Sequence, residues 1–209
     1  MNPHQALRRE ALRLHERYQR ELIERFSVCP WAKPSRMAGR TRAHVVTTKT
    51  GSAQELLPLL STWADESSLE VGFVIVPRFD GNADSFSDWA ESIVEPHADV
   101  FLSAPFYPSV SDSAGSIQFL RQTPDPTVQL VRRSRLEEIR VQDPPHYRDI
   151  FEIDMNDLAK EAEKQPVAAS VVAHNERMLE REGRAGIQAI FEDIRKDREQ
   201  TYAKLLPRM

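Results

Sequence analysis

The chain has 209 residues, of which 40% are hydrophobic and 29% charged, an ordinary globular mixture long enough for one domain with a substantial core. A net charge of −4 and a pI near 5.9 argue against a general electrostatic grip on nucleic acid, although they leave room for a local basic patch. Cys29 is the only cysteine, so no disulfide can form within the chain, and no apolar run approaches the ~20 residues that cross a bilayer. We therefore expect a cytoplasmic protein without a membrane segment.

A long helix is predicted at the start of the chain. Asn2 followed by Pro3 is typical of a helix start, because Asn caps the first turn and proline fits its first position. Apolar residues then recur every three or four positions as far as Phe26, which predicts one buried stripe that ends near Val28. Arginines and glutamates alternate off this stripe, and we interpret them as a solvated face in preference to a nucleic-acid contact.

Predicted strands and helices alternate through the middle of the chain. Residues 69–77 are nearly all apolar, which is typical of a strand buried on both faces. The other strands are predicted at residues 43–49, 99–106 and 127–132, and helices at residues 52–65 and 86–94. Helical crossovers between strands favour a sheet that is at least partly parallel. The expected fold is a two-layer α+β sandwich, a mixed sheet of about four strands with helices packed on it.

Further helices are predicted in the last third of the chain. Ser134 can cap a short helix, and Asp154 and Pro166 open two longer helical stretches. Residues 1–183 are expected to form a single domain, with residues 184–209 as a C-terminal helical extension. The extension carries an apolar stripe that must be covered by the domain or by a second copy in a homodimer: Ile187, Ile190, Phe191 and Ile194.

Cys29 and Lys33 follow the first helix and are the first candidates for chemistry. An ammonium group four residues away could lower the pKa of the thiol and favour the nucleophilic thiolate, which makes the two residues candidate catalytic groups. The alternative is a small buried residue in a turn, since free cysteines are among the most buried residues in proteins.

The connection from Tyr107 to Asp125 is long for a compact domain, and such loops are usually functional or disordered. Its serines and glycine could present backbone N–H groups to an anion, and they could equally form a flexible lid. Arg121 lies within this connection, while Arg132 and Arg133 end the strand that follows. Neighbouring side chains on a strand point to opposite faces, so only one of that pair can enter a given site.

The sequence contains six histidines, and none pairs with another at the spacing of metal ligands. It also lacks the Gly-Lys-Ser/Thr sequence of a nucleotide-binding loop and the Gly-x-Ser-x-Gly elbow of many hydrolases. We therefore predict neither a bound metal nor another cofactor.

Several segments resemble, in the same order, those of a known family. They are FSVCPWAK from Phe26, LEVGFVIVPRFDGNADSFSDW from Leu69, LSAPFYP from Leu102, TPDPTVQLVRR from Thr123 and VVAHNERMLEREG from Val171. Together they resemble bacterial domain-of-unknown-function family 1415 over roughly residues 10–183. The resemblance implies no established activity.

The departures from this family concern its histidines. The present sequence has Val76, Tyr107 and Gln129 where the family has histidine, so any chemistry built on those histidines is absent or replaced here. The resemblance instead singles out the polar residues that are shared with the family: Cys29, Lys33, Arg132 and Asn175.

Two functions are compatible with the sequence. The first is an enzyme or binding protein for a small anionic molecule, with a site at the carboxyl ends of the central strands. Its residues would be the catalytic pair Cys29 and Lys33 and the ligand-binding set Tyr107, Arg121, Arg132 and Asn175. The second is a non-catalytic regulatory or assembly module that acts through its terminal helices. Convergence of the predicted site residues on one concave site would favour the first.

Overall fold

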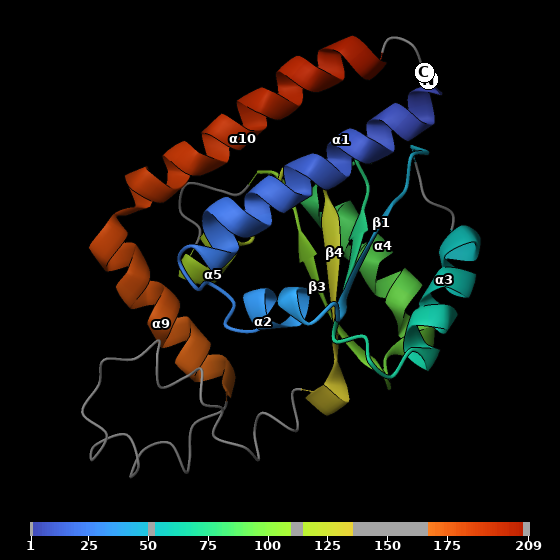
Figure 1. Cartoon of the computed structure of the whole chain (residues 1–209), viewed down its shortest axis with the longest axis horizontal. Helices are drawn as coiled ribbons and strands as arrows, with labels where there is room; N and C mark the ends of the chain where they lie inside the picture. The colour runs from blue at the N-terminus through green and yellow to red at the C-terminus, as the bar shows by residue number, and fades with distance from the viewer. Residues whose placement is uncertain (1, 50–52, 110–114, 136–166, 207–209) are drawn as a thin grey trace.

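The computed structural model describes residues 2–49, 53–109, 115–135 and 167–206 (Figure 1). The predictions for residues 136–166 lie outside this described part. The elements in chain order are α1 (Pro3–Tyr18), the π-helical turn η1 (Gln19–Glu24), α2 (Ala32–Met37), β1 (Thr41–Val45), α3 (Ala53–Asp65), β2 (Val71–Ile75), α4 (Ala83–Val94), the 3-10 turn η2 (Glu95–His97), β3 (Phe101–Phe106), α5 (Ser116–Leu120), β4 (Thr127–Arg132), α9 (Val167–Glu182) and α10 (Arg184–Leu205).

The four strands form one mixed sheet in the order β1-β2-β4-β3. β1 and β2 are parallel, whereas β4 runs antiparallel to both of its neighbours. The α+β class, the mixed four-stranded sheet and the long N-terminal helix are therefore confirmed. The register defines two edges of the sheet. Its amino edge holds the starts of β1, β2 and β3 and the end of β4, and its carboxyl edge holds the opposite ends.

Helices cover both faces of this sheet, where the sequence led us to expect two layers. One face carries α3 and α4, whose apolar residues pack on Val74, Val128 and Leu130. On the other face Ala11 of α1 packs on Phe73 and its neighbours in β1 and β2. Figure 1 shows α1 crossing the sheet on this second side, which we call the α1 face. The near-continuous apolar sequence of β2 follows from burial on both faces.

The predicted core is largely confirmed. Phe73, Ile75, Ile93 and Leu130 are buried, and Trp89 is partly buried beside them. Leu102 was expected in the core, but 40% of its surface is exposed. Leu102 lies on the α1 face beside Val131, over the β3–β4 half of the sheet. It is exposed because α1 packs over the β1–β2 half.

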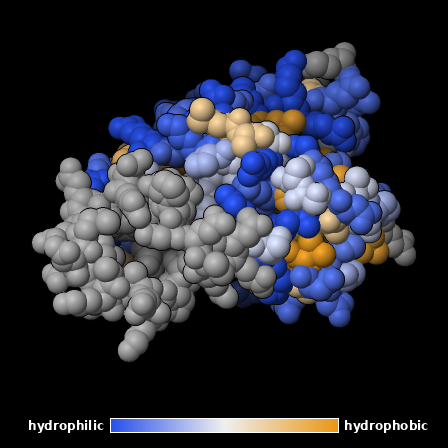
Figure 2. All heavy atoms as spheres, turned by 60° about the horizontal axis from the view of Figure 1, so that its bottom comes forward, coloured by the Kyte–Doolittle hydropathy of each residue, from blue (hydrophilic) through white to orange (hydrophobic). Residues whose placement is uncertain are grey.

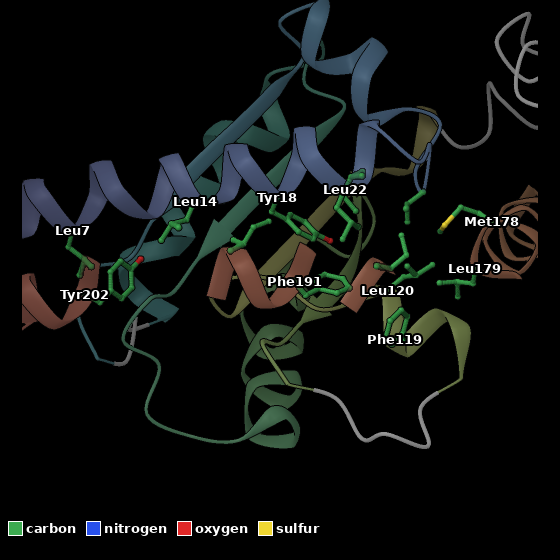
Figure 3. Packing of buried hydrophobic residues seen from close by; sticks show 14 residues of the cluster. Leu7, Leu14, Tyr18, Leu22, Phe119, Leu120, Met178, Leu179, Phe191 and Tyr202 are labelled. Carbon is green, nitrogen blue, oxygen red and sulfur yellow. The ribbon is translucent and has the colours of Figure 1, made fainter. Parts of the chain in front are cut away.

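The C-terminal helix α10 lies along α1 within the same chain (Figure 3). Ile187, Phe191 and Ile194 are buried, and they share a core with Leu14 and Tyr18 of α1. Gly183, with a φ of 75°, separates α10 from α9 and permits the change of direction. The apolar stripe that suggested a homodimer is therefore covered internally, which removes the observation behind that prediction.

Charged side chains fix α10 in place. Arg13 of α1 makes two hydrogen bonds of 2.8 Å to the Asp197 carboxylate. Near the carboxyl edge, Arg198 donates to buried Asp125 at 2.6 Å, and the Tyr202 hydroxyl donates to the other carboxylate oxygen at 2.8 Å. Asp125 thus connects the last helix to the start of β4.

Asp125→Ala is expected to lower the free energy of unfolding by about 3 kcal/mol, because it leaves the Arg198 charge without its partner. Asp193→Ala is the matched control, since Asp193 pairs with Arg17 through a side chain that is 69% exposed, and it should cost at most about 1 kcal/mol. Urea denaturation of both variants measures the difference. Equal small effects would show that the Asp125 contacts do not hold α10.

Candidate ligand-binding site on the sheet

The residues predicted from the sequence are divided between the two edges of the sheet. Arg132 ends β4 at the amino edge, and Lys33 lies on α2, which leads into the start of β1 there. Tyr107 and Arg121 lie at the carboxyl edge, where the backbone N–H of Tyr107 donates to the Arg121 carbonyl. The structure therefore places Lys33 and Arg132 at the opposite edge of the sheet from Tyr107 and Arg121, so these four predicted residues do not meet at one edge.

Arg132 holds the end of α3. Its guanidinium donates to the backbone carbonyls of Trp63, Ala64, Glu66 and Leu69 at 2.7–3.1 Å. Trp63 and Ala64 lie in the last turn of α3, where a helix end leaves carbonyls without partners, and Glu66 and Leu69 lie in the connection to β2. Arg132 therefore caps α3 and ties its end to the start of β2. Its guanidinium carbon also lies 5.2 Å from the centre of the Phe101 ring, within the α3/α4 core.

A polar network at the amino edge escaped the sequence-based prediction. Buried Glu70 accepts hydrogen bonds from Ser35 at 2.5 Å and Arg40 at 2.7 Å, and it pairs with Arg135 at 3.0 Å. Burial opposes ionisation of Glu70, but the hydrogen bonds and the two charges outweigh it and lower the pKa of the carboxyl group. A satisfied network of this kind serves to fix the start of β2.

Cys29 does not have the environment of a reactive thiolate. Its side chain packs against the core formed by α1, α9 and α10. Burial raises the pKa of the thiol although the backbone N–H groups of Trp31 and Ala32 oppose the shift. Lys33 is exposed and does not contribute to this shift, so the expected lowering by an adjacent ammonium group is wrong.

The connection from Tyr107 to Asp125, which the sequence predicted to be a flexible lid or an anion-binding loop, is ordered and partly buried in its second half. Its second half contains the short helix α5, and Gln122, Thr123 and Asp125 are buried. Serines 111 and 113 lie outside the described residues.

The two predicted ligand-binding residues of this connection have other contacts. The Tyr107 hydroxyl donates to the Gly81 carbonyl at 2.6 Å, and exposed Arg121 lies 6.0 Å from the centre of the Phe106 ring.

The β3–β4 half of the α1 face is less covered than the rest of the sheet. Cross-strand partners share a face, so the register places Gln129 beside Phe73 and opposite Ala104. The side chains on this part of the face are half-buried or exposed: Leu102, Ala104, Phe106, Gln129 and Val131. We call this set the open sheet face.

Side chains of α1 and α9 carry buried polar atoms without partners. Among the described residues, both ring nitrogens of His15, the Tyr18 hydroxyl and Oδ1 of Asn175 are buried without a hydrogen bond. The His15 ring lies 4.6 Å from the Phe73 ring and 6.1 Å from the Tyr18 ring, between centroids. Burial is the main cause that raises the pKa of the Tyr18 hydroxyl, and the charge of the Cys29 thiolate raises it further.

Asn175 approaches the same region from α9. Met178 and Leu179, three and four residues further along α9, are buried in the core that contains Tyr18. In Figure 3 the Tyr18 hydroxyl points along α1 toward the end of the molecule where Met178 and Leu120 lie. His174 beside Asn175 contacts the Phe26 carbonyl at 3.3 Å, which joins α9 to the segment that ends at Cys29. Cys29 and Tyr18 thus share a core with the α9 residues Met178 and Leu179, and His15 packs on Phe73 next to it. The sequence analysis had not selected His15 or Tyr18 as site residues.

The titratable groups of this region are neutral at pH 7. Burial lowers the pKa of His15 to about 4 and raises those of Tyr18 and Cys29. Neutral imidazole offers one donor and one acceptor, and Tyr18 and Asn175 add further hydrogen-bonding capacity. We call these four residues, His15, Tyr18, Cys29 and Asn175, the neutral polar cluster.

No group of three or more metal-ligating side chains occurs in the described ranges. None of the described helices is both long and apolar enough to span a bilayer. The visible surface in Figure 2 is mostly hydrophilic, with small separate hydrophobic areas.

Comparisons with models of known protein families, with curated proteins and with solved structures gave no match for this chain. The resemblance to the domain-of-unknown-function family accordingly stays a prediction that rests on the motifs quoted above.

Native Cys29 is expected to react with iodoacetamide at neutral pH more slowly than the same thiol in the urea-unfolded chain, because burial raises its pKa. Lys33→Met should leave the native rate unchanged, and mass spectrometry of quenched samples gives both rates. A fast native reaction that Lys33→Met slows would restore the thiolate interpretation.

The free energy of unfolding is expected to fall as the pH drops from about 6.5 to about 4, because the unfolded chain protonates His15 there and the folded chain does not. The difference between wild type and His15→Leu isolates this contribution and should change by about 3 kcal/mol between pH 8 and pH 4. Urea denaturation across this range measures it. A constant difference would mean that His15 titrates normally in the folded chain.

Proposed function

We propose that this chain binds a small molecule between the open sheet face and the neutral polar cluster. The observation that carries the proposal is the group of buried, unpartnered polar atoms on His15, Tyr18 and Asn175. An unpaired buried polar group costs about 1–3 kcal/mol, and native proteins contain few of them. A ligand that supplies the missing hydrogen bonds would recover this free energy on binding.

The position of these atoms supports the same proposal. They belong to α1 and α9, which are separated in sequence but share one core. Beside them lies the part of the sheet with half-buried side chains, Gln129 next to Phe73 and Leu102 beyond it.

The site argues for binding in preference to nucleophilic catalysis. The raised pKa of Cys29 keeps the thiol protonated at neutral pH, and thiols react as thiolates. Arg132 is committed to the end of α3, so the proposed site differs from the one that the shared residues suggested. The apolar stripe of α10 packs on α1, so it no longer supports the assembly function through the terminal helices, although the division of the predicted site residues between two edges of the sheet favours that alternative.

A thermal-shift screen of the full chain against a library of small metabolites tests the proposal. A compound at a hundred times its dissociation constant stabilises the folded state by about 2.7 kcal/mol, or roughly 5–10 °C for a chain of this size. We expect Asn175→Leu to lose this shift, whereas Gln5→Leu, an exposed amide on α1, should retain it. Gln129→Leu is the second test variant should Asn175→Leu fail to fold.

The proposal is contradicted if no compound stabilises the wild type, or if every stabilising compound acts equally on the wild type and all folded variants.

A further inference from the structure

The four strands end in register at the carboxyl edge of the sheet. Their terminal residues at this edge are aligned across the sheet: Val45, Ile75, Thr127 and Phe106. The alignment continues beyond the strands, since the backbone N–H of Val46 donates to the Ile75 carbonyl at 2.9 Å and that of Val76 to the Pro126 carbonyl at 2.8 Å. Two residues outside the sheet on each segment lie the positions that we call the carboxyl rim: Thr47, Pro77, Asp125 and Pro108. Neighbouring strands are about 4.8 Å apart, so this rim spans roughly 14 Å.

Two arginines of α10 contact the carboxyl rim. Arg198 donates to the Pro77 carbonyl at 3.1 Å, and Arg195 donates to the Pro108 carbonyl at 3.1 Å. Residues three positions apart share one side of a helix, so both guanidinium groups approach the rim from the same side of α10. In Figure 1, α10 and α2 accordingly lie at opposite ends of the strands.

Arg78 extends this arrangement toward β1. It directly follows Pro77, and its Nη1 makes a long contact of 3.5 Å with the Thr47 carbonyl. The three guanidinium groups therefore follow the rim in strand order, Arg78 beside β1, Arg198 beside β2 and β4, and Arg195 beside β3. We call these three residues the arginine row.

Two members of the arginine row have no ion-pair partner among the described residues. Asp125 neutralises Arg198, whereas Arg78 and Arg195 contact only uncharged oxygen atoms there. Arg195 makes these contacts through Nη2 alone, which leaves Nε and Nη1 for other acceptors. Both side chains are half-buried, so water offsets their charges only in part. Partly desolvated cations in one row favour the binding of an anion.

The attachment of α10 to the sheet explains only part of this row. Arg198 with Asp125 provides that attachment. Arg78 belongs to the segment after β2 and makes one long contact, so it adds little to the fold. An uncharged donor at position 195 could serve the Pro108 carbonyl without an unneutralised charge.

We propose that the arginine row binds a small ligand with several phosphate groups in a line, either free polyphosphate or the phosphate chain of a nucleotide. Guanidinium groups form paired, charge-assisted hydrogen bonds with phosphate oxygens. A linear chain of phosphates can meet groups at successive positions of the rim, whereas a compact anion reaches fewer of them. The site lies at the carboxyl edge and does not depend on the proposed function of the neutral polar cluster.

Isothermal titration calorimetry of the full chain at low ionic strength tests the proposal with tripolyphosphate, pyrophosphate, phosphate and citrate. We expect the affinity to rise from phosphate to tripolyphosphate, and citrate to bind more weakly than tripolyphosphate because its charges surround one carbon atom. Arg78→Met and Arg195→Met should each weaken tripolyphosphate binding by roughly tenfold or more, as expected for a lost hydrogen bond to a charged group. Lys196→Met is the matched control, since it removes the same charge from an exposed position of α10 and should retain the affinity.

Two further titrations identify the source of the phosphate chain and separate this site from the neutral polar cluster. Tighter binding of adenosine triphosphate than of tripolyphosphate would indicate a nucleotide, and equal binding would indicate that the phosphate chain alone is recognised. Asn175→Leu should bind tripolyphosphate as the wild type does.

The proposal is overturned if tripolyphosphate binds no more tightly than phosphate or citrate, or if both arginine variants bind it normally. It is also overturned if single-stranded DNA binds through the two arginines while tripolyphosphate does not bind, because the partner would then be a nucleic acid. Arg78→Met alone decides the outcome should Arg195→Met fail to fold.

Discussion

The packing of α1 between the sheet and α10 is the constraint on which the rest of the structure depends. One side of α1 places Ala11 and His15 against Phe73 of the central strand β2. The other side places Leu7 and Leu14 in the core that contains α10. A helix buried along two sides cannot move without exposing both cores, so α1 fixes the last helix relative to the sheet. The ion pairs of Arg13 and Arg17 with Asp197 hold the exposed side of the same contact.

This arrangement also creates the candidate site. A single helix packs over β1 and β2 and leaves the α1 face of β3 and β4 less covered, which accounts for exposed Leu102 and half-buried Gln129. The two-sided burial of α1 carries His15 and Tyr18 into the interior, where their polar atoms lack partners. In an ordinary core, phenylalanine or leucine would fill both positions at lower cost. The unpaired atoms are therefore the part of the fold that packing alone leaves unexplained.

Much of the fold was predictable because its signals are local. β4 has the predicted bounds, and β2 could be recognised from its unbroken apolar run. The short helices α2 and α5 were missed, since six and five residues carry too little periodicity to reveal a helix. The coverage of α10 by α1 depends on contacts between the two ends of the chain, which the sequence left open between the domain and a second subunit.

The candidate site was harder to predict for a related reason. Cys29 packs against the core that also holds Met178 and Leu179 of α9, but Arg132 caps α3 through carbonyls more than sixty residues away. Asp125 and Glu70 drew no attention because a single carboxylate in a strand-flanking segment has no distinctive spacing. Tyr18 belongs to the apolar stripe that predicted a buried side of α1, so its burial was expected, but nothing in the stripe shows that its hydroxyl lacks a partner. For His15, only the tertiary structure shows that the side chain is buried.

The partners of the three unpaired side chains test the central claim most directly. In a high-resolution crystal structure, we predict electron density of a bound molecule or ordered water within hydrogen-bonding distance of Tyr18 Oη and Asn175 Oδ1. Direct hydrogen bonds from these two atoms to groups of the protein itself would contradict the account, because the polar cluster would then be an internally satisfied part of the core.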